Sequence, residues 1–276
     1  MARWTLQDIS WQAFDADRID PALVPVVKAA SLVEYNSGDY RIYLKRVFAD
    51  DPKLCRAVDG WADEELQHGL ALARWAKLAD AGFDLEDSFR RFTDGYKLPL
   101  DATASVRGSR SGELISRCMI ETGTNSFYSS LAEATDEPVL KAICRNIAAD
   151  EAAHYSLFYH HLARHLEAER LGFWQRLRIA LGRIAESEDD ELAWAYHAAN
   201  FDGAPYSRRR CTAAFGSRAL RFYSPAVVRR GVGMIFTAIG LEPEGPLGRV
   251  AARVGWWMLC AQRLRCRAVV RLAGSV

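Results

Sequence analysis

The chain has 276 residues, of which half are hydrophobic, and a formal net charge of +1. This length and composition allow a sizeable buried core and exclude a disordered chain. The longest apolar runs, Val232 to Leu241 and Val254 to Ala261, fall short of the roughly 18 to 20 residues that span a bilayer. The N-terminus has no apolar core of signal-peptide length. A cytoplasmic protein is therefore expected, with peripheral attachment to the inner face of the membrane as an alternative.

Charge is divided unevenly along the chain. From Pro205 onward there are 13 Arg, no Lys and only two acids, Glu242 and Glu244, so this segment carries +11 and residues 1–204 carry −10. Such a division predicts two surfaces with different partners, although ordinary solvated helix faces are an alternative. Six cysteines without Cys-x-x-Cys spacing favour free thiols in a reducing compartment, with those at 55, 118 and 144 buried.

Helical spacing recurs along the chain, and no strand-like alternation persists, so the predicted class is all-α. Asp20-Pro21 and Asp51-Pro52 each place a favoured N-cap before a proline, which predicts a helix start at both positions. The expected helices are one from Pro21 interrupted at 36–39, and then 40–48, 52–80, 85–93, 111–135, 138–169, 173–186, 188–200, 207–222, 225–240 and 247–272. They divide into an N-terminal arm (1–19), a four-helix bundle (20–170) and a helical C-terminal extension (171–276).

Two copies of the motif Glu-x-x-His organise the predicted bundle. Glu65 and His68 form the first copy, and Glu151 and His154 form the second. Positions i and i+3 share one face of a helix, so each copy directs a carboxylate and an imidazole toward one point. A single copy is common on a solvated face, but both copies lie in otherwise apolar lines, where an unpaired buried charge is costly. A metal ion would remove that cost.

Two single glutamates complete a ligand set. Glu34 lies 31 residues before Glu65, and Glu121 lies 30 residues before Glu151. Four glutamates and two histidines are the ligand set of a di-iron carboxylate bundle. These donors suit two iron ions, or manganese, and predict oxygen activation.

An acidic residue precedes the glutamate of each motif copy. Ligating imidazoles usually give their second N–H to a carboxylate or carbonyl. From the symmetry of the repeat, we expect Asp150 to face His68 and Glu64 to face His154.

Three stretches carry a family resemblance: Asp63-Glu64-Glu65-Leu66-Gln67-His68-Gly69, Ile120-Glu121-Thr122-Gly123-Thr124 and Asp150-Glu151-Ala152-Ala153-His154. They resemble the soluble acyl-carrier-protein desaturases of the ferritin-like superfamily over about residues 20–165. The resemblance implies a ferritin-like bundle with additional C-terminal helices. It also implies a di-iron oxidase that uses O₂ and electrons from a ferredoxin-type donor to desaturate or hydroxylate an unactivated C–H of an acyl chain.

The resemblance assigns one further residue, Thr124, to the oxygen side of the metals. The alternative is an ordinary helix threonine that bonds its own i−4 carbonyl. Other functions also stay open: a rubrerythrin-like peroxidase or ferroxidase, an iron-binding protein, a di-iron hydroxylase of another substrate such as tRNA, or a metal-free structural bundle.

The arginines of residues 205–276 predict an anionic docking surface, because the planar guanidinium fork matches carboxylate and phosphate. The expected occupant is an acidic acyl carrier protein or an anionic membrane surface. A homodimer also stays open.

Overall fold

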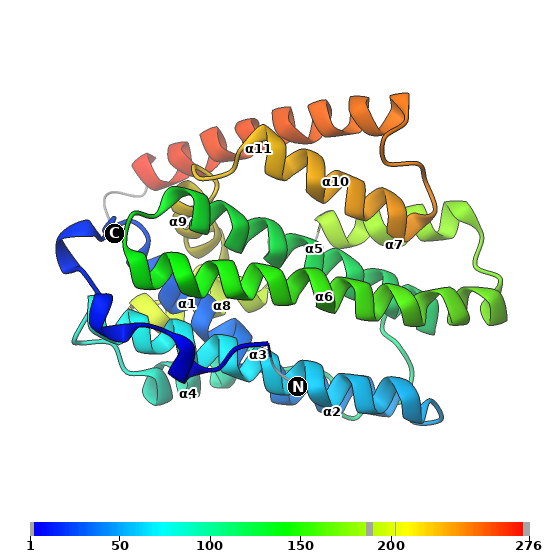
Figure 1. Cartoon of the computed structure of the whole chain (residues 1–276), viewed down its shortest axis with the longest axis horizontal. Coiled ribbons are helices and arrows are strands. Elements are labelled where there is room, and N and C mark those ends of the chain that lie inside the picture. The colour runs from blue at the N-terminus through cyan, green and yellow to red at the C-terminus, as the bar shows by residue number, and fades with distance from the viewer. Residues whose placement is uncertain (1–2, 186–189, 202, 273–276) are drawn as a thin grey trace.

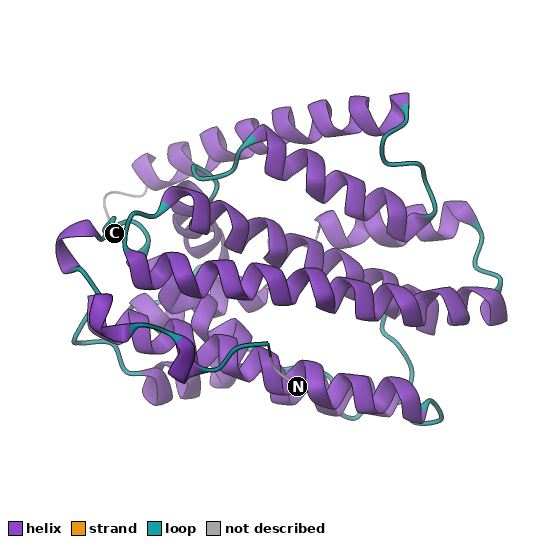
Figure 2. Ribbon diagram, viewed as in Figure 1, coloured by secondary structure: helices purple, strands orange, loops and turns teal. Residues whose placement is uncertain are grey.

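The computed structural model describes residues 3–185, 190–201 and 203–272, and over these ranges it contains helices and no strand (Figure 2). The all-α prediction is therefore confirmed. Residues 186–189, where two expected helices meet, lie outside the described residues. The α-helices are α1 (Val24–Tyr35), α2 (Ser37–Val47), α3 (Pro52–Ala79), α4 (Leu85–Gly95), α5 (Arg110–Ala134), α6 (Pro138–Glu169), α7 (Phe173–Ala185), α8 (Asp190–Asn200), α9 (Arg208–Ala219), α10 (Pro225–Ile239) and α11 (Pro246–Leu272).

The start of the first helix differs from the prediction. α1 begins at Val24 and not at Pro21. Asp20 instead begins a turn. Its backbone carbonyl accepts a hydrogen bond from the N–H of Leu23 at 2.9 Å, and its side chain accepts one from the N–H of Ala22 at 3.0 Å. Because the turn uses these acceptors, the N-cap signal at this position does not open the helix directly.

The second helix, in contrast, begins earlier than expected. Only Asn36 separates α1 from α2, which starts at Ser37. The Ser37 hydroxyl donates to the carbonyl of Ala62 in α3 at 2.9 Å, and this bond is buried. The polar stretch 36–39, which was expected to interrupt the helical pattern, therefore contains the first turn of α2, and this turn is hydrogen-bonded to α3.

Four helices enclose the centre of the molecule. α1 packs on α3, α3 packs on α6, and α6 packs on α5 (Figure 1). α7 and α10 lie against α5, α8 lies against α1 and α4, and α11 runs along the outside across α9 and α10. None of the described helices is long and apolar enough to cross a membrane.

The interior is layered along the four central helices. One apolar cluster includes Leu72 and Trp75 of α3 and Ile143 of α6, and a second includes Val58 of α3 and Phe158 of α6. On both helices the Glu-x-x-His motif lies between these two clusters. The fold thus places a buried polar layer between two apolar ones.

All six cysteines are free. Cys118 and Cys144 are buried, as expected, whereas Cys55 is only half-buried. It lies on the first turn of α3, where its thiol contacts the carbonyl of Phe48.

Candidate metal centre

The six predicted ligands lie together in the polar layer and come from four different helices. None of them is more than 7% exposed. They are Glu34 from α1, Glu65 and His68 from α3, Glu121 from α5, and Glu151 and His154 from α6.

Their oxygen and nitrogen atoms form two groups, in each of which the ligand atoms lie within 4.8 Å of one another. The first group contains Glu34, Glu65, His68 and Glu151, and the second contains Glu65, Glu121, Glu151 and His154. Each group thus has one glutamate and one histidine of its own. Glu65 and Glu151 belong to both groups, so their carboxylates lie where two ions could share them.

Each histidine is held by an acidic residue on its outer side. Asp150 Oδ2 lies 3.0 Å from Nε2 of His68, and Glu64 Oε2 lies 2.8 Å from Nε2 of His154. These are the pairs expected from the repeat symmetry. Because an ionised carboxylate only accepts hydrogen bonds, both Nε2 atoms carry a proton, and both Nδ1 atoms face the cluster.

The N-terminal arm extends this arrangement through Trp4. The sequence did not predict this contact, because the arm has no helical periodicity. The Trp4 indole donates to Asp150 Oδ2 at 2.6 Å, and its ring lies parallel to that of His68, with centroids 6.1 Å apart. Gln67 of α3 donates to the Trp4 carbonyl at 2.9 Å. The arm therefore packs over the outer side of the centre and is not merely attached to the bundle.

Tyr128 is a second residue that the motifs did not point to. Its buried hydroxyl donates to Glu34 Oε1. Burial, and then the charge of Glu34, raise the pKa of Tyr128, so the phenol keeps its proton and acts as a donor. Its spacing of seven residues from Glu121, two helical turns, was the available signal.

Thr124 makes the backbone contact of an ordinary helix threonine and also contacts a candidate ligand. Its hydroxyl lies 2.6 Å from Glu151 Oε2 and 3.2 Å from the carbonyl of Ile120, one turn earlier. The residue is thus an ordinary helix threonine in its backbone contact and a neighbour of a candidate ligand through the same oxygen.

Burial shapes the protonation of the carboxylates. Desolvation, followed by the neighbouring charge of Glu65, raises the pKa of Glu34, and burial followed by the charge of Glu151 raises the pKa of Glu121. Burial would raise the pKa of Glu65 too, but His154 outweighs it and lowers that pKa. The protein alone therefore supplies too little positive charge to ionise all four carboxylates.

Burial acts on the histidines in the opposite direction. It lowers the pKa of His68, but the hydrogen bonds that the imidazole donates to Asp150 and Glu151 outweigh it and raise the pKa well above its usual value. Hydrogen bonds donated to Glu64 and Glu65 do the same for His154. Protons on both Nδ1 atoms thus occupy the positions where an ion would bind.

Three buried atoms of the six candidate ligands have no well-aligned hydrogen-bond partner among the described residues: Oε1 of Glu121, Oε1 of Glu151 and Nδ1 of His154. An unsatisfied buried polar atom costs roughly 1–3 kcal/mol. One cation per group would give all of these atoms a partner, and two divalent cations balance four carboxylates. The residues therefore fit a carboxylate-bridged pair of iron or manganese ions.

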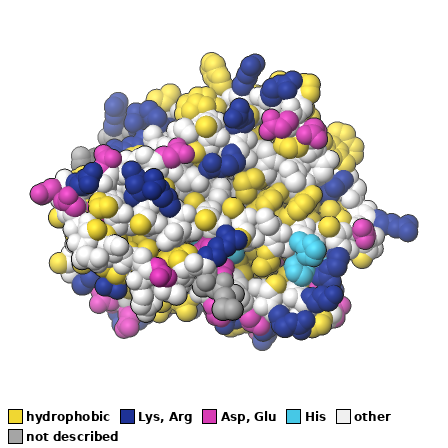
Figure 3. Space-filling model, viewed as in Figure 1, with side chains coloured by type: hydrophobic (Ala, Val, Ile, Leu, Met, Phe, Trp, Pro, Cys, Tyr) yellow, Lys and Arg dark blue, Asp and Glu magenta, His cyan; other side chains and the backbone are white. Residues whose placement is uncertain are grey.

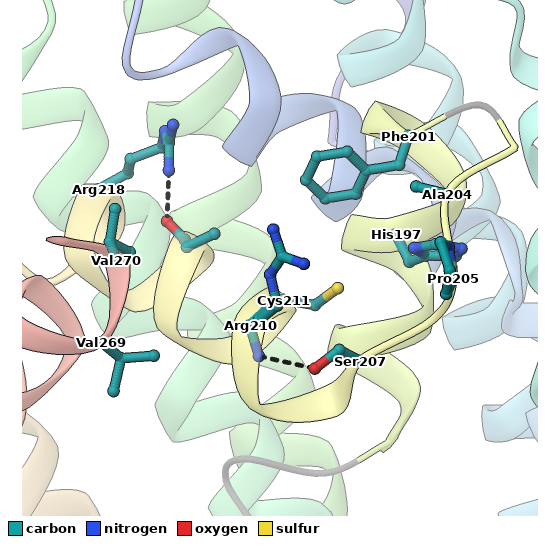
Figure 4. Close-up of a pocket in the computed structure, with 11 residues that line it drawn as sticks. His197, Phe201, Ala204, Pro205, Ser207, Arg210, Cys211, Arg218, Val269 and Val270 are labelled. Atoms are coloured by element: carbon teal, nitrogen blue, oxygen red, sulfur yellow. Dashed lines mark hydrogen bonds between the residues drawn. The ribbon is translucent and has the colours of Figure 1, made fainter. Parts of the chain in front are cut away.

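Two cavities lie beside this layer rather than in it. The larger, of about 300 Å³, comes nearest at Ile120, the residue before Glu121. The smaller, of about 60 Å³, lies between α8, α9 and the end of α11, with Arg210, Arg218 and Cys211 around it (Figure 4). None of the six candidate ligands lines either cavity.

The sequence matches no known protein-family model, and no curated protein matches it. Function must therefore be inferred from the site itself.

Proposed function

We propose that this protein is an O₂-dependent oxidase built on a carboxylate-bridged pair of iron ions in a ferritin-like bundle formed by α1, α3, α5 and α6. One observation carries the proposal, namely that Glu65 and Glu151 belong to both ligand groups. A site for one ion needs no shared carboxylate, whereas shared glutamates from paired Glu-x-x-His motifs are typical of di-iron and di-manganese centres. Manganese is the alternative occupant.

A bound pair of iron ions supplies the electrons that reduce O₂. The chain's own residues fix the ligands and hold protons near them. Asp150 and Glu64 keep the Nδ1 atoms of the two histidines directed inward. The Tyr128 phenol orients the carboxylate of Glu34 by donating to it.

Thr124 is the group best situated to move a proton within the layer. Its hydroxyl lies 2.6 Å from Glu151 Oε2 and can donate a proton there while accepting one from another donor. Apolar clusters lie on both sides of the layer and limit the access of bulk water, so hydroxyl groups such as that of Thr124 are routes by which protons can reach the carboxylates.

We propose an acyl or lipid-like substrate with an unactivated C–H, which is desaturated or hydroxylated, and a ferredoxin-type electron donor. This choice depends on the resemblance of the three motif stretches to acyl-carrier-protein desaturases. A cavity of about 300 Å³ is lined by Ile120, the residue before Glu121, and could admit part of a substrate larger than O₂.

A second candidate is a ferroxidase or rubrerythrin-like peroxidase, which is favoured by one observation: none of the six ligands lines a described cavity. Fe²⁺, O₂ and hydrogen peroxide are small enough to reach a closed layer without a substrate channel. This function would use the same six ligands.

The test combines metal analysis with oxygen uptake by the full chain. We expect two iron ions per chain after anaerobic loading with Fe²⁺. With ferredoxin, its reductase and a long-chain acyl carrier protein, O₂ uptake should depend on the acyl group, and mass spectrometry should show loss of two hydrogens or gain of one oxygen. O₂ uptake that follows only the Fe²⁺ supplied would support the ferroxidase instead, and one zinc without iron would contradict both functions.

A further inference from the structure

Helix α11 contacts the rest of the molecule along only a narrow part of its surface. It is 27 residues long, but only Gly248 and Cys266 among its described residues are buried. Gly248 allows close contact with the preceding turn, because a Cβ there would lie 2.0 Å from the carbonyl oxygen of Pro243. The remaining surface of the helix faces away from α9 and α10 (Figure 1).

The outward surface is apolar where an exposed helix is normally polar. Its large exposed side chains from 247 to 257 recur at spacings of three and four residues, and the last one, at 264, follows two helical turns after 257, so they form one stripe along the helix. Trp257 is 77% exposed and Met258 is 61% exposed. The members of this stripe, called here the α11 stripe, are Leu247, Val250, Val254, Trp257, Met258 and Leu264.

Exposed arginines accompany the α11 stripe. They are Arg249, Arg253, Arg265 and Arg271. Arg253, Arg265 and Arg271 have no carboxylate partner among the described residues, unlike Arg91 or Arg110 elsewhere in the chain. Figure 3 shows hydrophobic and basic side chains interleaved along the upper edge of the view, where α11 lies.

The geometry points to an anionic phospholipid surface as the partner of the α11 stripe. A stripe from residue 247 to 264 is about 26 Å long at 1.5 Å per residue, and it can lie flat in the interface between headgroups and acyl chains. Trp and Met would enter the apolar boundary while arginines bind phosphate. The absence of lysine from residue 205 onward fits fork-shaped recognition of phosphate oxygens.

Charge argues against a second copy of the chain in this position. Two α11 stripes packed together would bring eight exposed arginines into one interface with no acid from either helix. An acidic carrier protein would match the charge, but it would leave much of a 26 Å apolar stripe in need of a flat apolar partner. An anionic bilayer satisfies both requirements. This inference does not depend on the metal centre.

The experiment is vesicle co-sedimentation of the full chain with phosphatidylcholine alone and with phosphatidylcholine containing phosphatidylglycerol. We expect binding only to the anionic vesicles, weakened by salt. Arg253→Gln with Arg265→Gln should lower the partition coefficient about 25-fold, at roughly fivefold for each arginine near an anionic surface. Trp257→Ser should lower it about tenfold.

Matched controls remove the same groups elsewhere. Trp174 is also 77% exposed but lies on α7, so Trp174→Ser should keep wild-type binding. Arg56→Gln with Arg145→Gln removes two exposed charges from α3 and α6 and should lower the partition coefficient less than threefold. Circular dichroism verifies that every variant is folded.

Three outcomes would overturn the inference. The first is equal binding to both vesicle types, and the second is an equal loss of binding in the α11 variants and their controls. The third is the absence of vesicle binding together with a Trp257-dependent complex, either with an acidic acyl carrier protein or with a second copy of the chain in sedimentation velocity.

Discussion

The polar layer of the central helices and the α11 stripe both differ from the usual distribution of side chains, in which polar groups are exposed and apolar groups are buried. In the layer, four glutamates and two histidines are buried among apolar residues. On α11, tryptophan, methionine, leucine and valine side chains are exposed. Buried charge and exposed apolar surface each suggest a binding partner: an ion for the polar layer and an interface for the α11 stripe.

The difference lies in how each region would recognise its partner. The polar layer brings specific atoms within 4.8 Å of one another, so the loss of one atom changes what can bind. At the α11 stripe, the free energy of binding would be the sum of small contributions from many side chains along the helix, and no single side chain would determine it. Single substitutions should therefore have large effects in the layer and graded effects on α11.

The largest effect should come from a shared ligand. Glu65→Ala removes a carboxylate from both groups, and we expect both metal ions to be lost. Glu34→Ala removes a ligand from one group only, so one ion per chain should remain. Inductively coupled plasma mass spectrometry after loading with Fe²⁺ measures both.

Asp63→Ala is the matched control, because Asp63 lies two residues from Glu65 on α3 but is exposed and paired with Arg41. It should keep both ions. If Glu65→Ala and Glu34→Ala lost the same number of ions, the carboxylate of Glu65 would not be shared.

The outer carboxylates should have the next largest effect. Asp150→Ala removes the partner of His68 Nε2, and metal affinity should fall by about 10–100-fold, as for outer partners of ligating histidines in general. Trp4→Phe removes one hydrogen bond to Asp150 and should cost less than Asp150→Ala. Competition with a chelator measures both affinities.

Trp174→Phe, an exposed substitution of the same kind, should leave metal affinity unchanged. Equal affinities for Trp4→Phe and wild type would mean that the arm covers the centre without holding Asp150.

Glycine substitutions extend the comparison to backbone packing. A Cβ on Gly69, the residue after His68, would lie 2.6 Å from the backbone nitrogen of Tyr35 in α1, which cannot turn aside. Gly69→Ala should lower the free energy of unfolding by about 1–3 kcal/mol and weaken metal binding by moving α1 away from α3. At Gly216 the nearest atom to the Cβ would be the Cys266 thiol sulfur, at 2.8 Å, and no backbone atom is among the three nearest, so that substitution should cost less.

Gly60, exposed on the same helix as Gly69, has open space around its Cβ position. Gly60→Ala should raise the free energy of unfolding by roughly 0.5–1 kcal/mol. Denaturant unfolding of the three variants checks these values. Equal destabilisation by Gly60→Ala and Gly69→Ala would mean that the contact between α1 and α3 does not set the effect at Gly69.

A buried charge that the protein satisfies by itself, that of Asp51, should have an effect on stability that depends on pH. Burial alone would raise the pKa of Asp51, but hydrogen bonds from the Leu54 N–H, Arg164 and His165 outweigh it and lower the pKa to about 2. Because the folded pKa lies below the unfolded value of about 3.9, the charge stabilises the protein above pH 4, by about 2 kcal/mol. That contribution is lost as the pH falls from about 4 toward 2.

Asp51→Asn keeps the helix cap and removes the charge, so its stability should be lower than that of wild type at pH 7 and approach it near pH 2. Asp84→Asn is the control, because Asp84 caps α4 with no ion pair among the described residues. A constant difference between Asp51→Asn and wild type over this pH range would mean that packing, not charge, is responsible.

Features set by local spacing could be predicted from the sequence, and features set by partners distant along the chain could not. The helix carrying Glu65 and His68 begins at Pro52 as expected, because Asp51 caps it through its own neighbour Leu54. The first helix starts three residues later than expected, because Asp20 is used by a turn.

The same distinction applies to the site. The ligands follow from two motif copies whose spacing is helical. Trp4 could not be predicted, because its partner Asp150 lies 146 residues away and an aperiodic arm offers no face from which to infer a direction. Tyr128 shares a helix face with Glu121, but its bond to Glu34 depends on how closely α1 approaches α5.

The wide spread of the ligands along the chain has a consequence for biosynthesis. Glu34, Glu65 and His68 are made first, and they can offer an ion only three of the six ligands. The second shared carboxylate, Glu151, follows 83 residues after His68, and only then can either group be completed. Trp4 is translated before all of them but gains its partner Asp150 almost last. With the proposed pair of ions, loading would thus be a late event in the synthesis of each chain, and the N-terminal segment gains its partner at the centre only when the ligand set is nearly complete.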